Sequence, residues 1–143
     1  MPTMPTIHPV VKAYVVRHGL GEDALREDGR LALEFDDRYR VQVRPASEGR
    51  VALVSRLADL TRWSRLAGDD LLQRLAHRSA GLARTHAAGL VIDEALNSLQ
   101  LQQVLPAATG VDALERELAE FVNVLAFWSR TCNEEAGRDR KST

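Results

Sequence analysis

Histidine and cysteine are among the residue types of this 143-residue chain that could hold a metal ion or take part in acid–base or nucleophilic chemistry. His8, His18, His77 and His86 stand apart from one another, and Cys132 is the only cysteine. Zinc sites need such ligands at short, regular spacings, as in HExxH or paired CxxC, and neither pattern occurs. We therefore interpret the histidines as surface or boundary residues and predict no metal and no cofactor.

Acidic pairs and glycine motifs give no better evidence for catalysis. Asp36 and Asp37 fit a turn, and Asp69 and Asp70 fit the beginning of a helix, where carboxylates are stabilised by the helix dipole. The sequence contains no GxSxG nucleophile motif, no GxGxxG and no GxxxxGK[ST] phosphate loop. Cys132 falls near the end of a predicted helix, where a thiolate is disfavoured. The sequence thus predicts a protein that is not an enzyme.

The amino-acid composition is typical of a soluble globular domain. Hydrophobic residues make up 45% of the chain and charged residues 27%, and the net charge is −1. Nearly all the basic residues are arginine, but they scatter along the sequence, so we predict binding to neither nucleic acid nor membrane. The single cysteine, the lack of a long apolar run and a start without signal-peptide features lead us to expect a cytoplasmic protein.

Residues 31–44, LALEFDDRYRVQVR, alternate between apolar and polar types and predict an antiparallel hairpin with one apolar face. A three-residue loop at 36–38 sets Phe35 opposite Tyr39 and Glu34 opposite Arg40, so that both apolar rows lie on the same side. Part of that apolar face must be covered by the rest of the chain, and we expect a partner to cover apolar surface nearby.

The remaining elements follow from helical and strand periodicities. We predict a helix at 9–18, which begins with Pro9 and ends at Gly19, a third strand from Val51, a helix from about Asp69 to residue 88, a second hairpin at 90–93 and 98–105, and a final helix. A capping box from Thr109 to Asp112 opens that last helix. The order αβββαββα predicts an α+β fold, an antiparallel sheet with helices packed on it. We expect a flexible N-terminus at 1–8, one domain at 9–136 and a polar disordered tail at 137–143.

Several short segments together resemble one protein family. They are LALEFDD at 31–37, YRVQV at 39–43, VALVSRL at 51–57, DLLQRLAH at 70–77, LQLQQVLP at 99–106 and FVNVLAFW at 121–128. Their order and spacing over residues 10–130 resemble the class I type III secretion chaperones, the Tir chaperone family of small bacterial cytoplasmic proteins.

The resemblance implies a non-catalytic homodimer. Such a protein binds the extended N-terminal segment of a type III secretion effector, keeps it unfolded and soluble, and presents it for export. The effector and a second copy of the chain are thus the expected partners, and the secretion ATPase is a further candidate.

Two sets of residues are candidates for these contacts. The apolar helix at 9–18 and the outer side of the third strand could form an effector-binding groove, with Val10, Val11, Tyr14, Ala52 and Val54 as its lining. The small residues at 80–88 permit close approach of a second copy, and we expect the dimer interface to contain Leu75, Leu82, Ala83, His86 and Leu90. The alternative for the second set is that these residues pack inside the monomer.

Three other functions stay open at this stage. The chain could be an adaptor or regulator of the same fold that binds a structured partner without a role in secretion. It could be a small enzyme whose site forms only in space, or an RNA-binding protein that uses its arginines.

Overall fold

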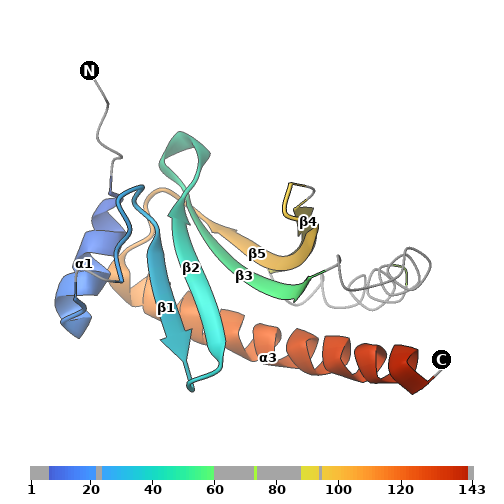
Figure 1. Ribbon diagram of the computed structural model, residues 1–143. Coiled ribbons are helices and arrows are strands. Elements are labelled where there is room, and N and C mark those ends of the chain that lie inside the picture. Colours follow the sequence, from blue (N-terminus) through green and yellow to red (C-terminus); the bar gives the residue numbers. More distant parts are fainter. Residues whose placement is uncertain (1–6, 22–23, 60–72, 74–87, 94, 142–143) are drawn as a thin grey trace.

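The computed structural model describes residues 7–21, 24–59, 73, 88–93 and 95–141 (Figure 1). The described elements are α1 (Pro9–His18), β1 (Leu31–Phe35), β2 (Tyr39–Pro45), the 3-10 turn η1 (Ser47–Gly49), β3 (Val51–Asp59), β4 (Gly89–Asp93), β5 (Ser98–Leu105) and α3 (Val111–Lys141). The strands form one antiparallel sheet in the order β1-β2-β3-β5-β4. The α+β fold is therefore confirmed, and the predicted helix at 69–88 lies outside the described residues except at residues 73 and 88.

The first hairpin has the register that its alternation predicts. Phe35 is opposite Tyr39, and Glu34 is opposite Arg40. Asp36 and Asp37 in the loop both have positive φ, at 53° and 55°, which aspartate tolerates better than most residues. Leu31, Val41 and Val43 are fully buried at the other end of the hairpin.

The sheet opens between β2 and β3. These strands pair only from Gln42 opposite Val54 to Pro45 opposite Val51, although both continue past Gln42 and Val54. Beyond that point the Ser55 hydroxyl donates to the Arg40 carbonyl at 2.6 Å, in place of a backbone ladder. Figure 1 shows β3 curving away from β2 to follow β5. This divergence creates a gap on the polar side of the sheet.

Helix α1 has the predicted bounds. Pro9 occupies the first turn, and Gly19 ends the helix in the left-handed conformation at φ 58°. The capping side chain is His8, whose Nδ1 accepts a hydrogen bond from the Val10 N–H at 3.1 Å. The sequence analysis did not predict this cap.

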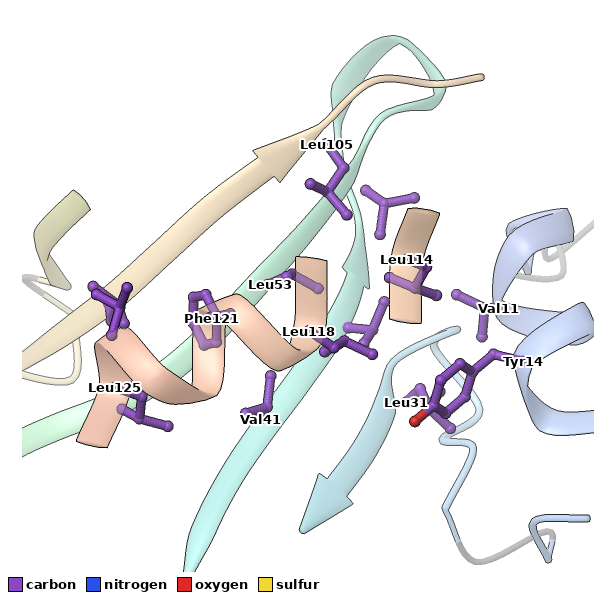
Figure 2. Packing of buried hydrophobic residues seen from close by; sticks show 14 of the residues in the cluster. Val11, Tyr14, Leu31, Val41, Leu53, Leu105, Leu114, Leu118, Phe121 and Leu125 are labelled. Carbon is purple, nitrogen blue, oxygen red and sulfur yellow. The ribbon is translucent and has the colours of Figure 1, made fainter. Parts of the chain in front are cut away.

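Helix α3 packs across the apolar face of the sheet and supplies much of the core (Figure 2). Its buried side chains recur at helical spacing, and they contact the inward residues of β1, β2, β3 and β5. Val124 and Cys132 are also buried on this side of the helix. The most deeply buried apolar residues of α3 are Leu114, Leu118, Phe121, Leu125 and Trp128.

The two ends of α3 differ from the prediction. The first helical bond joins the Leu114 N–H to the Gly110 carbonyl, and the Thr109 hydroxyl donates to Pro106 at 2.6 Å. Gly110 thus takes the position of the cap, and Thr109 stabilises the preceding turn. At the other end the helix continues to Lys141 and does not end near Gly137. One glycine costs a helix only about 1 kcal/mol, and good helix formers surround this one.

Candidate functional site

Helix α1 lies against both the sheet and α3, and this position decides which of its side chains are free. Val10 and Val11 are buried in the core. Val16 is the spare apolar residue of the helix, since it is 80% exposed. Val10 and Val11 are therefore corrected from groove residues to core residues. The sequence suggested surplus apolar surface on α1 because it does not show that this helix packs on two neighbours.

Tyr14 lines an apolar hollow of about 440 Å³ between α1, the end of β1 and α3. Its other apolar lining residues are Phe35 of β1 and Leu118, Ala119 and Val122 of α3. Phe35 is only partly buried, so the apolar face of the hairpin is sealed at its Leu31 end and accessible at its loop end. We call this depression the apolar hollow.

Charged side chains cross the rim of the apolar hollow and join the two helices. Arg17 lies 2.5 Å from Asp112 and 3.1 Å from Glu115, and His18 Nε2 lies 2.6 Å from Glu115 Oε1. The hydrogen bond with Asp112 raises the pKa of Arg17, which keeps the guanidinium charged. The Tyr14 and His18 rings contact each other with their centroids 4.3 Å apart and their planes tilted by 36°. Burial, and then the negative charge of Glu115, raise the pKa of the Tyr14 phenol.

Ala52 and Val54 lie on the opposite face of the sheet from α1 and α3. Their neighbours across the strands are the polar residues Arg44, Gln42 and Gln102 and the exposed Val104. The five residues expected to line one groove are thus divided among the core, the apolar hollow and the outer face. Strand alternation predicts which residues share a face, but the face on which a short helix docks does not follow from it.

A second hollow, of about 570 Å³, opens on the outer face where β2 and β3 diverge. Val54 and Ser55 line it, and Leu125 and Ser129 of α3 are reached through the gap. The remaining lining includes five arginines, Arg30, Arg38, Arg40, Arg44 and Arg56. The sequence interpretation that the arginines do not cluster is wrong for these five, because the fold brings them together. We call this depression the arginine hollow.

The expected dimer interface falls mostly outside the described residues. Leu75, Leu82, Ala83 and His86 belong to that part of the chain. Leu90 is described: it lies on β4 opposite Leu101 and packs partly buried against the core. Its neighbours Val91 and Ile92 are 39% and 44% exposed on an edge strand.

The described histidines and the cysteine make contacts that hold the fold together. His8 caps α1, His18 pairs with Glu115, and Cys132 is buried in the core. Within the described ranges, His, Cys, Asp and Glu side chains form no group of three that could hold a metal ion. No helix in the described part of the chain is long and apolar enough to cross a membrane.

Residues 12–129 match the model of the Tir chaperone protein (CesT) family. The chain belongs to the Tir chaperone protein family. The match includes most of α1, the whole sheet and most of α3, so the family assignment covers both hollows. No curated protein matches this chain.

Solved structures with the same fold include three complexes. The chain is similar to a chain in the HopA1-SchA chaperone–effector complex, with 15% identity and a TM-score of 0.65 over 85% of this chain and 91% of that one. It is similar to a chain in the ExsC–ExsE complex, with 21% identity and a TM-score of 0.63 over 87% and 96%. It is also similar to a chain in the complex of the Yersinia pestis type III secretion chaperone SycH with a fragment of YscM2, with 20% identity and a TM-score of 0.57 over 87% and 100%. This Tir chaperone family member therefore shares the fold of those chains over nearly its full described length.

Proposed function

We propose that this protein is a non-catalytic chaperone of the bacterial cytoplasm, which binds the extended N-terminal segment of a type III secretion effector as a homodimer. It keeps that segment unfolded and soluble and presents it for export. Family membership supports the class of function. The similar SchA and SycH complexes support a polypeptide ligand. The observation that carries the proposal is the apolar hollow beside the edge of β1.

The apolar hollow suits an anchoring side chain of an unfolded segment. Phe35 and Val122 are only partly buried and offer apolar contact area that the chain's own core does not use completely, and the buried Tyr14 borders them. An extended segment has no core of its own, so burial of its apolar side chains in such a hollow drives binding. The contacts of Arg17 and His18 with Glu115 join α1 to α3 beside the hollow.

The edge of β1 can supply backbone hydrogen bonds to the same segment. The Ala32 N–H points to this edge, since it donates to the Ala24 carbonyl at 2.8 Å. Alternate residues of a strand present their backbone groups to the same side, so Glu34 also faces the edge. Among the described residues this edge is covered only at its beginning, where Leu25 forms an isolated antiparallel bridge with Leu31 and Ala24 accepts from Ala32, and no strand of the sheet pairs with the edge at Glu34. A bound segment could thus extend the sheet and place a side chain beside Phe35.

Dimerisation through the β4 edge is part of the proposal. β4 is the other edge strand of the sheet, and its exposed Val91 and Ile92 form an apolar border. Leu90 and the predicted residues Leu75, Leu82, Ala83 and His86 are proposed to take part in the same interface. A two-fold arrangement buries the same apolar strip of both copies.

The first test is co-expression with the secreted protein encoded beside this chain, followed by limited proteolysis of the purified complex. We expect proteolysis to leave a protected N-terminal segment of the partner. Light scattering of the chaperone without its partner should give a mass near twice 15.9 kDa. Contacts only with a folded domain of the partner would favour an adaptor instead. A monomeric mass would contradict the dimer.

A matched pair of variants tests the apolar hollow. Ala119 is an exposed residue of α3 that lines the hollow, and Asn123 is exposed on the same helix but does not line it. The Ala119→Trp variant should fill the hollow and abolish capture of the partner segment, whereas Asn123→Trp should bind normally. Both variants should fold, because neither position is buried. Normal capture by Ala119→Trp would contradict the proposed site.

A further inference from the structure

The arginine hollow concentrates positive charge without a matching set of acidic residues in its lining. Arg30, Arg38, Arg40, Arg44 and Arg56 face it, and its lining contains no Asp or Glu among the described residues. Three described acids lie at its border: Glu34 is opposite Arg40 across the hairpin, Asp28 pairs with Arg30 at 2.6 Å, and Asp93 interacts with Arg44 over a longer range. The whole chain has a net charge of −1, so this local excess is not a consequence of a basic protein.

Two of these arginines, Arg38 and Arg44, have neutral partners that leave the guanidinium charge available, whereas Arg30 is ion-paired with Asp28. Arg44 donates to the Gln42 amide oxygen through Nε at 2.8 Å and Nη2 at 2.7 Å, so its nearest partner is neutral. Arg38 lies over the Tyr39 ring, and Arg30 contacts a half-exposed aspartate. Burial, and then the positive charge of Arg30, lower the pKa of Arg44. An anionic group in the hollow would relieve this repulsion.

Arg40 and Arg56 are the best placed to bind a ligand. Both are exposed, and neither makes an ion pair among the described residues. They flank the gap from β2 and β3, at the positions where the ladder between these strands has ended. The planar fork of a guanidinium matches a carboxylate with two parallel hydrogen bonds.

The shape of the hollow favours an extended polypeptide over other anions. Its volume of about 570 Å³ holds several side chains, and Val54, Tyr39 and Leu96 add apolar contacts to the charged ones. The gap lies beside the strand backbone of β3, which an added extended segment could follow. A nucleic acid duplex needs a broad basic surface, but these arginines face into a depression of limited size.

We infer that the arginine hollow is a second binding site, which takes an acidic extended segment of a partner polypeptide with carboxylates at alternate positions. Alternate side chains of an extended segment point to the same side, which would direct its carboxylates toward Arg40, Arg44 and Arg56. The inference rests on the proposed function only in assigning this segment to the same partner that fills the apolar hollow. The two sites lie on opposite faces of the sheet, so they can be tested separately.

The test uses the full-length protein and a fluorescent peptide in which glutamate alternates with serine, with a glutamine–serine peptide as its neutral counterpart. We expect saturable binding of the glutamate peptide at about 150 mM salt, where distant surface charges are screened, and at least tenfold weaker binding of the glutamine peptide. Equal binding of the two peptides would overturn the inference. Displacement of the glutamate peptide by inorganic phosphate or a short RNA at lower concentration than by unlabelled peptide would also overturn it.

Charge-matched variants locate the site. Arg40→Gln with Arg56→Gln should weaken binding of the glutamate peptide about tenfold or more, because two charge-assisted contacts are lost. The control is a double variant with the same charge change, Arg116→Gln with Arg50→Gln. Both control arginines are exposed and neither lines the hollow, so binding should stay within about twofold of the parent. Equal weakening by both pairs would indicate general electrostatics and would contradict the site.

A variant at the other hollow separates this inference from the proposed function. Ala119→Trp should leave binding of the glutamate peptide unchanged, because Ala119 lies on the opposite side of the sheet. If Ala119→Trp abolishes partner capture and the parent protein does not bind the glutamate peptide, only the second site is refuted. If the peptide binds and Ala119→Trp still captures the partner, only the apolar hollow is refuted.

Discussion

His8 and Gly49, which are 41 positions apart in the sequence, are joined by a hydrogen bond of 2.9 Å between the imidazole Nε2 and the glycine carbonyl. The other ring nitrogen of His8, Nδ1, accepts from the Val10 N–H. Both contacts are satisfied together when Nε2 carries the proton and Nδ1 does not. His8 thus connects the beginning of α1 to the turn between β2 and β3, and it helps to set the position of α1 beside the sheet.

Replacement of His8 should destabilise the protein through two separate contacts. His8→Ala removes the helix cap and the bond to Gly49, and we expect a loss of about 1 kcal/mol in the free energy of unfolding. His8→Asn can still cap the helix but is too short to reach Gly49, so its loss should be smaller. Urea denaturation measures both values. Equal stability of His8→Ala and the parent would show that the cap contributes nothing.

Gly19 should be sensitive to substitution because of its backbone conformation alone. An added Cβ at Gly19 or at Gly21 would meet no atom within 4 Å, but only Gly19 has a positive φ, 58°. Gly19→Ala should therefore cost about 1 kcal/mol or slightly more, and Gly21→Ala should be close to neutral. Thermal unfolding of the two variants provides the comparison. Similar melting temperatures would contradict the left-handed end of α1.

Two phenylalanines of α3 test the direction in which this helix faces. Phe121 is fully buried against the sheet, whereas Phe127 is 41% exposed. Phe121→Ala should lower the free energy of unfolding by about 3–5 kcal/mol, because it leaves a cavity in the core. Phe127→Ala should have a much smaller effect. Comparable losses in urea denaturation would mean that the helix is rotated from the orientation described.

Local sequence patterns predicted those features that depend on neighbouring residues. The alternation of residues 31–44 fixed the register of the first hairpin, since a shift by one residue would turn Leu33 and Val41 to the polar side. Pro9 and Gly19 marked the ends of α1 because each restricts the backbone in a known way. The class of fold followed from the order of these elements.

Features that depend on contacts distant in the sequence could not be predicted in this way. The His8 cap is not a residue type that caps helices most often, and its second partner comes from a remote turn. A continued ladder would set Arg40 directly opposite Arg56, and the hollow between them opens only because β3 leaves β2 after Val54. The predicted groove is divided for a similar reason, since the docking of α1 places Val10 in the core.

Tyr14 should make the protein less stable at alkaline pH. Burial, and then the charge of Glu115, raise the pKa of its phenol above 10.0, the ordinary value. Above pH 10 the unfolded chain loses this proton before the folded chain does, so the free energy of unfolding should fall as the pH rises through about 10 and further until the folded phenol also ionises. Below pH 10 the contribution of Tyr14 to the free energy of unfolding does not change.

The measurement is urea denaturation at about pH 8 and about pH 11. Tyr14→Phe should reduce the difference between the two values, and Glu115→Gln should reduce it partly. Tyr39→Phe, which removes the other phenol of the chain, is the control. An equal reduction in Tyr39→Phe and Tyr14→Phe would contradict the assignment to Tyr14.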